Sequence, residues 1–332
     1  MDLNPKVSMR ILHLEFDQYP VEAQRKLLEG FEVVALQVED QISLKRYLEK
    51  DGAFEAVFTR LGLLLDKEIL DLMPRLKVIA TSTTGLNHID CEYAKANSIA
   101  LLSLKGEFEF LSHVKSTAEH TWLLLLSLLR NHIPSVKDVI EHGNWNRLPY
   151  LSEEVNGKKM GIIGFGRLGK IVAGYAHAFS ATVLVNDISD IDTESYSFVK
   201  PVSLEELLAQ ADIVILMISY SEENQNFFDK SKFTLMKENA YFINTSRGEL
   251  VDEEALLNCL VSGKLRGAAL DVLHGDSAWE SKHKGNLALL NYAKNHSNLI
   301  LTPHMGGFGK TSIGMTRNFI VEKFLKEIKL EN

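Results

Sequence analysis

Two successive series of alternating strand-like and helix-like segments constrain the fold of this chain more than any other feature. In the first hundred residues, apolar runs predict strands at Arg10–Phe16, Phe31–Leu36, Ala56–Thr59, Leu76–Thr81 and Ile99–Leu102. Amphipathic stretches such as Val21–Leu28 and Ser43–Lys50 separate these runs and predict helices. Strands that alternate with helices form βαβ units and a mostly parallel sheet.

A second alternation begins at Lys159. Its predicted strands are Met160–Ile163, Thr182–Asn186, Ile213–Met217, Tyr241–Asn244, Ala268–Val272 and Leu299–Leu301. Its predicted helices are Leu168–Ala178, Leu204–Gln210 and Glu253–Val261. Because 332 residues are too many for one compact core of typical size, we expect an α/β protein with two doubly wound parallel-sheet domains.

Two further helical stretches flank the second alternation. One runs from Thr117 to about Glu141, where Pro134 predicts a kink or break. The other, Arg317–Leu330, carries apolar residues at helical spacing and therefore needs a partner surface. The first domain could supply that surface, so we expect it to be discontinuous and closed by the chain's own tail.

The composition excludes several classes of protein. A formal net charge of −8 gives no reason to expect nucleic acid as a partner. The longest apolar stretch, around Trp122 to Leu129, is too short to span a bilayer, and the N-terminus lacks the pattern of a signal peptide. Cys91 and Cys259 have neither disulfide nor metal-ligand spacing. We expect a cytoplasmic protein without a metal site.

A glycine-rich turn marks a cofactor site. Gly164, Gly166 and Gly169 form GxGxxG directly after a strand-like run and at the start of a helix. The glycines permit a tight turn and a close approach to pyrophosphate, and the helix N-terminus favours the phosphates. Asp187, about 20 residues further on, would bind the ribose hydroxyls and repel a 2′-phosphate. The pattern predicts NAD rather than NADP. The alternative is that Asp187 is a plain turn residue.

In its second half the chain resembles the D-isomer-specific 2-hydroxyacid dehydrogenases. The matching segments are Asn244–Leu256, Gly263–Val272 and Leu301–Gly307, which lie in the family's order together with Gly164–Gly169. The resemblance in the first half is looser and centres on Lys77–Asp90 and Ser116–Thr121. The resemblance implies a Rossmann NAD-binding domain inserted in a flavodoxin-like substrate domain. We place the boundaries at 111–304 for the former and at 1–110 plus 305–332 for the latter.

The family's active site would map onto Arg247, His304 and an acid between them. Arginine can grip a carboxylate or keto oxygen with two hydrogen bonds, and histidine suits proton transfer to the carbonyl oxygen. The alternatives are a salt bridge from Arg247 to Asp252 or Glu253 and a core role for His304.

The third position departs from the family. Asp276, followed by serine, stands where the family usually has glutamate before proline. Since aspartate is one methylene shorter, contact with His304 should require a shifted backbone or a bridging water. Asp276 keeps the charge and is our predicted partner, with Glu280 as a second choice.

The resemblance also implies binding residues around this centre. The predicted cofactor contacts are Gly164, Gly166, Arg167, Leu168, Gly169, Asp187, Thr245, Asp271 and Thr121. The predicted substrate contacts are Thr84, Gly85, Leu86 and Lys105, of which Lys105 could pair with a phosphate. A structural turn before Asp90 is an equal alternative for the 84–86 loop. Glu119 matches the helix near the nicotinamide or is an acid in a first helical turn.

The expected function is NAD-dependent interconversion of a small D-2-hydroxy acid and its 2-keto acid, with phosphoglycerate- or glycerate-type substrates favoured. The resemblance implies a homodimer through the cofactor domain, using the Thr117–Glu141 helix, although its apolar face could equally be core. A non-catalytic NAD(H)-binding sensor or corepressor is the alternative function. A related dehydrogenase for formate or phosphite is a further one.

Overall fold

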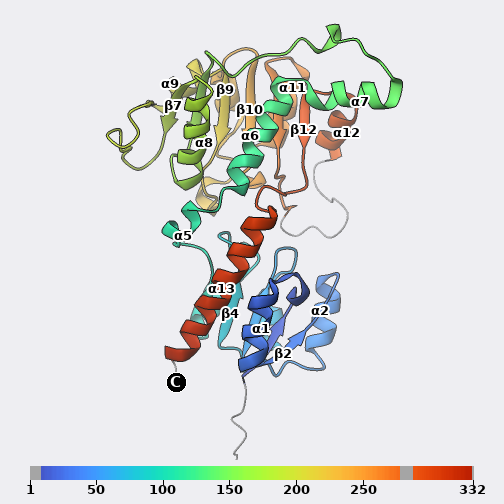
Figure 1. Ribbon diagram of the computed structural model, residues 1–332, viewed down its shortest axis with the longest axis vertical. Helices are drawn as coiled ribbons and strands as arrows, with labels where there is room; N and C mark the ends of the chain where they lie inside the picture. Colours follow the sequence, from blue (N-terminus) through green and yellow to red (C-terminus); the bar gives the residue numbers. More distant parts are fainter. Residues whose placement is uncertain (1–8, 277–286, 331–332) are drawn as a thin grey trace, which may run out of the picture. The chain divides into compact units, whose positions relative to one another are not determined.

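The computed structural model describes residues 9–276 and 287–330 (Figure 1). They divide into two compact units, which we describe separately. Unit 1 comprises residues 9–114 and 310–330, and unit 2 comprises residues 115–276 and 287–309. Within the described chain, no helix has the length and apolar character needed to cross a membrane.

Unit 1 is built on a five-stranded parallel sheet with the order β2-β1-β3-β4-β5. The strands are β1 (Arg10–His13), β2 (Glu32–Ala35), β3 (Ala56–Thr59), β4 (Val78–Thr81) and β5 (Ala100–Leu102). The helices are α1 (Val21–Gly30), α2 (Gln41–Leu48), α3 (Lys67–Asp71), α4 (Cys91–Ala96), α5 (Phe108–Ser112) and α13 (Lys310–Leu330), and a 3-10 turn, η1 (Phe16–Gln18), follows β1.

The C-terminal helix α13 completes the core of unit 1. It packs against α1, β4 and β5, and Figure 1 shows it beside α1. Ile320, Val321 and Phe324 are fully buried on this face of the sheet. Helices α2, α3 and α4 cover the opposite face with a second apolar cluster. The tail of the chain is therefore an integral part of the first unit's fold.

Unit 2 is built on a seven-stranded parallel sheet with the order β12-β11-β10-β9-β6-β7-β8. The strands are β6 (Lys159–Ile163), β7 (Thr182–Asn186), β8 (Val199–Pro201), β9 (Ile213–Leu216), β10 (Ala240–Asn244), β11 (Leu265–Leu270) and β12 (Leu299–Leu301). The helices are α6 (Ser116–Leu129), α7 (His132–His142), α8 (Arg167–Ala178), α9 (Leu204–Gln210), α10 (Lys230–Leu235), α11 (Glu253–Val261) and α12 (Leu287–Asn295). Helices α6 and α8 share one apolar cluster with the sheet. Helix α9 contacts β6 and β7, α11 contacts β11, and α12 contacts β12.

These sheets confirm the predicted fold class. All strand pairs in both sheets are parallel, and in each sheet the strand order reverses beside the first strand of its unit. Ligands of open α/β sheets bind outside the carboxyl ends of the strands near such a reversal. In unit 2 the reversal lies between β6 and β9, where the glycine-rich turn follows β6.

The predicted long helix is interrupted earlier than expected. The prediction of a break at Pro134 is wrong, because α6 ends at Leu129 and α7 begins at His132. Asn131, with φ of 47°, adopts the left-handed conformation and separates the two helices. Asparagine tolerates this conformation better than most residues. Pro134 lies in the first turn of α7, where a missing backbone N–H costs nothing.

Candidate active site

The glycine-rich turn has the geometry of a phosphate cradle. Gly164 has φ of +96°, and a Cβ there would lie 2.7 Å from the backbone of Met217. A Cβ on Gly169 would lie 2.1 Å from the Gly164 carbonyl oxygen, so only glycine lets α8 approach β6 this closely. Gly166, the N-cap of α8, faces open space. The first N–H groups of α8 can therefore meet an anion at an unobstructed helix N-terminus.

Asp187 follows β7 beside this turn. Its Oδ2 accepts a hydrogen bond from the Phe165 N–H at 2.6 Å, and its Oδ1 accepts one from the Ser189 N–H at 2.8 Å. A carboxylate has about four lone-pair sites, so these two bonds leave capacity for ribose hydroxyls. Asp187 thus braces the glycine turn and has the chemistry needed to hold a ribose.

Other predicted cofactor residues lie in the same unit. Thr121 on α6 and Thr245 after β10 are buried, and their hydroxyls form a hydrogen bond at 2.7 Å. Arg167 and Leu168 form the first turn of α8. Burial lowers the pKa of the Arg167 guanidinium. The residues expected to hold NAD therefore lie at the carboxyl ends of the strands or on α6 and α8.

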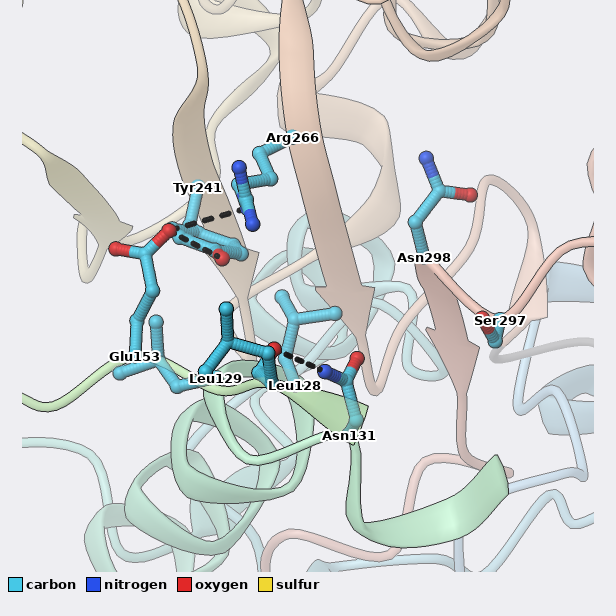
Figure 2. Close-up of a pocket in the computed structure, with 9 residues that line it drawn as sticks. Leu128, Leu129, Asn131, Glu153, Tyr241, Arg266, Ser297 and Asn298 are labelled. Carbon is cyan, nitrogen blue, oxygen red and sulfur yellow. Dashed lines mark hydrogen bonds and ion pairs between the residues drawn. The ribbon is translucent and has the colours of Figure 1, made fainter. Parts of the chain in front are cut away.

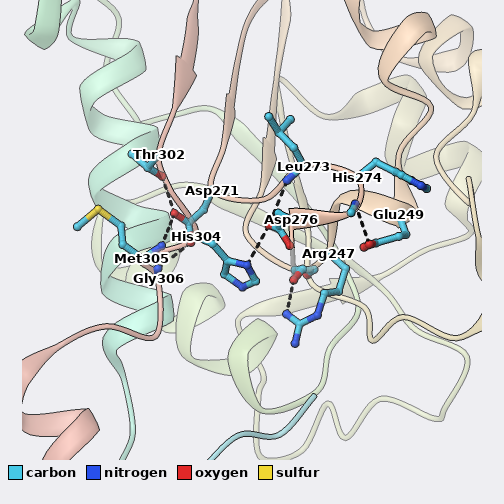
Figure 3. Close-up of polar contacts among 12 residues, drawn as sticks. Arg247, Glu249, Asp271, Leu273, His274, Asp276, Thr302, His304, Met305 and Gly306 are labelled. Carbon is cyan, nitrogen blue, oxygen red and sulfur yellow. Dashed lines mark hydrogen bonds and ion pairs between the residues drawn. The ribbon is translucent and has the colours of Figure 1, made fainter. Parts of the chain in front are cut away.

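His304 and Asp276 are in direct contact (Figure 3). His304 Nδ1 lies 2.9 Å from Asp276 Oδ2, and the side chains are 26% and 1% exposed, respectively. The shorter acid therefore reaches the imidazole without an intervening water. A buried carboxylate that contacts Nδ1 fixes the ring orientation and favours the charged imidazole, while Nε2 stays available for a reacting group. Glu280, the second-choice acid, lies outside the described residues.

The backbone at His304 is held in an uncommon conformation. Its φ is +51°, in the left-handed region, and its N–H donates to the Asp271 carbonyl oxygen at 2.8 Å. Such conformations cost about 1 kcal/mol or more in a residue with a Cβ and persist only where surrounding contacts enforce them. The turn after β12 is thus shaped to direct this one imidazole.

Asp271 organises that turn. Its buried carboxylate accepts hydrogen bonds from Thr302 Oγ1 at 2.6 Å, Met305 N at 2.9 Å and Gly306 N at 2.7 Å. His120 Nε2 lies 3.1 Å from the same carboxylate. Burial alone would raise the pKa of Asp271, but the hydrogen bonds, that of His120 first among them, lower it below the usual value. These contacts occupy the predicted cofactor residue with the protein's own donors, and its contact with NAD stays a prediction.

Arg247, which Figure 3 draws together with His304 and Asp276, precedes the 3-10 turn Gly248–Leu250. Its Nη1 donates to the carbonyl oxygen of Ser246 at 2.7 Å. The predicted alternative, a salt bridge to Asp252 or Glu253, does not occur. Asp252 caps α11 through the N–H of Ala255, and Glu253 accepts from the N–H of His274. The guanidinium therefore makes no ion pair with either acid.

The predicted substrate loop belongs to unit 1 and is described there alone. Thr84, Gly85 and Leu86 follow β4, and Leu86 packs against the unit's core. Thr83 Oγ1 donates to the Gly85 carbonyl oxygen at 2.8 Å. Asp90 caps α4, as expected if the 84–86 loop is a structural turn before this helix. Thr84 is exposed, and substrate binding by the loop stays a prediction. Lys105 is also exposed, at the turn after β5.

Three side chains that contribute to this architecture were not predicted. His120 contacts Asp271, while its neighbour Glu119, which was weighed for a site role, is exposed in the first turn of α6. Glu249 and Glu253 accept hydrogen bonds from the backbone of the Asp276 turn. Their signal in the sequence is weak, because glutamate in a first helical turn is common for reasons of helix stability alone.

A small cavity lies at the opposite, amino-terminal edge of the same sheet (Figure 2). Its volume is about 100 Å³. Tyr241 and Arg266, near the starts of β10 and β11, line it with Glu153 and Asn131. Glu153 contacts Arg266 at 3.1 Å and accepts from the Tyr241 hydroxyl at 3.4 Å. This cavity is separate from the residues at the carboxyl ends of the strands, and its charged groups neutralise each other.

Comparisons with known proteins identify the family to which this fold belongs. The family model described as D-isomer specific 2-hydroxyacid dehydrogenase, NAD binding domain, matches residues 122–306. A glyoxylate reductase of Thermococcus onnurineus is 31% identical over 297 residues, 86% of this chain and 84% of that protein. A D-3-phosphoglycerate dehydrogenase of Bacillus subtilis is 30% identical over 77% of this chain and 46% of its own length.

A solved structure extends the likeness to the whole fold. The crystal structure of a D-lactate dehydrogenase from Aquifex aeolicus, complexed with NAD and lactic acid, superimposes with a TM-score of 0.78 at 28% identity. The match covers 96% of this chain and 95% of the other. The fold and site thus define an NAD-dependent oxidoreductase. The chain belongs to the D-isomer-specific 2-hydroxyacid dehydrogenase family, and the predicted cofactor, NAD, is confirmed.

Proposed function

We propose that this protein reduces a small 2-keto acid to the D-2-hydroxy acid with NADH, and catalyses the reverse oxidation, through His304, Asp276 and Arg247. The observation that carries the proposal is the contact of 2.9 Å between a partly exposed imidazole and a fully buried carboxylate. Such a pair can deliver a proton to a carbonyl oxygen and take it back.

Each residue of the site has a separate task. Arg247, which has no carboxylate partner among the residues described, would hold the substrate carboxylate or keto oxygen with its planar fork. His304 Nε2 would donate a proton to the keto oxygen during reduction and accept it during oxidation. Asp276 would stabilise the charged imidazole throughout. When bound, the nicotinamide supplies or accepts the hydride.

The cofactor would lie against the glycine cradle and Asp187. The first turn of α8, with Arg167 and Leu168, would bind the pyrophosphate, and Asp187 the adenosine ribose. Asp187 belongs to an acidic segment, 187–194, that also contains Asp190, Asp192 and Glu194. Carboxylates there repel a 2′-phosphate, which supports NAD over NADP. Thr121, Thr245 and Asp271 remain proposed contacts near the nicotinamide.

The substrate should be small and of the glyoxylate or hydroxypyruvate type. Relatives with similar coverage are named glyoxylate reductases, and one further relative is named D-3-phosphoglycerate dehydrogenase. The backbone of Thr84, Gly85 and Leu86 would hold the substrate carboxylate. Lys105 is an exposed cation that could pair with a phosphate, so a phosphorylated substrate is the specific alternative within this class.

A substrate panel tests this proposal. NADH oxidation would be followed with glyoxylate, pyruvate, hydroxypyruvate and 3-phosphohydroxypyruvate, with NADPH as the control cofactor. Turnover of a small keto acid by NADH is the expected result. Fastest turnover of the phosphorylated acid, lost in Lys105→Ala, would identify phosphoglycerate as the hydroxy acid. Binding of NADH without turnover of any keto acid would overturn the catalytic proposal in favour of a sensor.

We also propose that the protein is a cytoplasmic homodimer. The apolar residues Trp122–Leu129 of α6, predicted as an interface or as core, lie almost entirely in the core of unit 2. Exposed apolar residues lie in the segment after α6 instead. They are Ile133, Val136, Val139 and Ile140 on α7, and Trp145, Leu148 and Leu151 after it. Exposed apolar side chains gathered in one segment of the chain are typical of a protein interface. The free thiols Cys91 and Cys259 suit a reducing compartment.

Sedimentation tests the dimer. The wild-type chain should sediment at twice the mass of 37.3 kDa, and Ile140→Asp with Trp145→Asp should convert it to a folded monomer. A wild-type monomer at micromolar concentration would contradict this interface.

A further inference from the structure

Two glutamates next to Arg247 hold the turn that carries Asp276. Glu249, in the 3-10 turn Gly248–Leu250, accepts a hydrogen bond from the Gly275 N–H through Oε1 at 3.1 Å. Glu253, the first residue of α11, accepts one from the His274 N–H through Oε1 at 2.7 Å. Two carboxylates of the segment 247–253, the arginine segment, thus accept hydrogen bonds from consecutive backbone N–H groups of one turn. Figure 3 labels Glu249 and the turn residue His274.

The turn itself is tightly wound. Gly275 has φ of +72°, and the Asp276 N–H donates to the Leu273 carbonyl oxygen at 3.1 Å. The Leu273 N–H in turn lies 3.3 Å from Asp276 Oδ2, the oxygen that contacts His304. The Asp276 carboxylate therefore contacts the backbone of the turn that carries it. Any rotation of the turn moves the oxygen that the imidazole contacts.

The arginine segment and the turn are also packed backbone against backbone. A Cβ on Gly248 would lie 2.0 Å from the Leu273 carbonyl carbon and 2.3 Å from the His274 nitrogen. No side chain fits between the two segments. The two glutamates can therefore reach the turn directly, without an intervening side chain.

The shorter acid makes this support necessary. Asp276 has one rotatable bond fewer than glutamate and cannot compensate for a displaced backbone by extending its side chain. Its other oxygen, Oδ1, is buried and accepts no hydrogen bond from the described residues. Since a hydrogen bond weakens steeply beyond about 3.5 Å, a displacement of about 1 Å would break the contact with His304.

We propose that Glu249 and Glu253 are positioning residues that place Asp276 against His304. The inference rests on the proposed function of His304 as proton donor. The two charge-assisted hydrogen bonds hold N–H groups that have no other hydrogen-bond partner among the described residues. Through the turn they set the position of Asp276 and the orientation of the imidazole.

The test compares Glu249→Ala and Glu253→Ala with Glu249→Gln and Glu253→Gln. Each alanine variant should lower kcat by about 10-fold, and both together by about 10²-fold, the cost of an ångström-scale misplacement. The glutamine variants should stay within about threefold of wild type, because an amide oxygen accepts the same hydrogen bond. The KM for NADH should change less than about twofold in all of them, because the glycine cradle is untouched.

The split between kcat and KM separates positioning from general damage. A displaced Asp276 misplaces the imidazole that delivers the proton, whereas the arginine that would hold the substrate is unchanged. A looser contact should therefore lower kcat for keto-acid reduction and leave the KM for the keto acid within about twofold of wild type. Glu254→Ala, an exposed neighbour on α11, is the matched control and should behave as wild type.

Wild-type kcat in the folded alanine variants would overturn the proposal. If alanine prevents folding, as judged by circular dichroism, Glu249→Asp and Glu253→Asp carry the same test, because a side chain one methylene shorter loses the hydrogen bond. His304→Asn, assayed beside them, keeps the two proposals apart. An inactive His304→Asn with unaffected glutamate variants refutes only the positioning roles, whereas an active His304→Asn refutes the proposed function itself.

Discussion

Both units combine a histidine, an arginine and an acid, but the pairing is opposite: unit 1 has His13 at the end of β1, Glu15 after it and Arg317 on α13. In unit 1, Arg317 Nη2 contacts Glu15 Oε2 at 2.8 Å, and both side chains are buried. His13 is 0% exposed, stacks on Phe58, and its Nε2 has no hydrogen-bond partner among the described residues. In unit 2 the acid contacts the histidine instead.

The two sets show why the same residue types form a reactive site in one unit and a structural contact in the other. Burial, and to a lesser degree the positive charge of Arg317, lower the pKa of His13 to about 3, so this imidazole is neutral at pH 7 and lacks the additional ring proton that a general acid donates. Arg317 is already bound to an acid and cannot grip a substrate. His304 is partly exposed, and Arg247 is bound only to a neighbouring carbonyl oxygen among the described residues. The exposure of the histidine and the partner of the arginine therefore distinguish the reactive residues of unit 2 from the structural residues of unit 1.

The comparison is tested most severely by removing each histidine. His304→Asn should lower the turnover of keto-acid reduction by about 10²–10⁴-fold, the range for general acid–base catalysis. His13→Phe should keep turnover within about twofold, because His13 touches only the unit 1 core. Stopped-flow or steady-state NADH oxidation measures both. Near-native turnover in His304→Asn would remove the distinction between the two histidines.

The two arginines should differ in stability. Arg317→Met should destabilise the fold by about 3–5 kcal/mol, because it leaves the Glu15 charge buried without its partner. Burial raises the pKa of Glu15 more than Arg317 lowers it, so the loss should shrink at acidic pH as Glu15 takes up a proton. Arg247→Met should cost less than about 1 kcal/mol. Urea unfolding measures both, and equal losses would contradict the comparison.

For catalysis, Arg247 rather than Arg317 should be the arginine whose removal has the larger effect. Arg247→Ala should lower kcat/KM by about 10²–10³-fold and reduce kcat as well as raise KM, if the guanidinium stabilises charge that develops on the keto oxygen. Arg247→Lys should not restore the loss, because lysine lacks the two-donor fork. Steady-state kinetics at saturating NADH measures these values. A change in KM alone would reduce Arg247 to a binding residue.

The smallest expected effect is the pH dependence that His13 gives to stability. Its folded pKa of about 3 lies below the usual 6.5, so the unfolded chain binds the proton more tightly. Stability is therefore lost as pH falls from about 6.5 to about 3, by about 2 kcal/mol between pH 7 and pH 5. His13→Phe should remove this part of the loss. Identical slopes of unfolding free energy against pH in the two proteins would refute it.

The sequence predicted the strands better than the links between them. Ala56–Thr59, Thr182–Asn186 and Leu299–Leu301 were predicted residue for residue, because buried parallel strands are nearly continuous apolar runs. The short helices α3 and α10 were not predicted, although each begins after an aspartate that caps it. The helix break was assigned to Pro134 because proline is the stronger signal, whereas asparagine at 131 ends the helix through its backbone conformation.

The contact between His304 and Asp276 shows the limit of sequence reasoning about the site. The family resemblance named both residues, but the aspartate was expected to need a shifted backbone or a bridging water. The direct contact depends on hydrogen bonds that Glu249 and Glu253 accept from a turn more than 20 residues away along the chain. Such long-range backbone support leaves no local pattern in a single sequence.

The most direct test of the account is a double-variant cycle between His304 and Asp276, measured as kcat for the keto acid turned over fastest. NADH binding, followed by fluorescence, verifies that each variant keeps its cofactor site. Because the two side chains act as one unit, Asp276→Asn should slow the wild type by about 10²-fold yet hardly slow His304→Asn further. Losses that multiply in the double variant would mean that the two residues act independently, and would contradict the account.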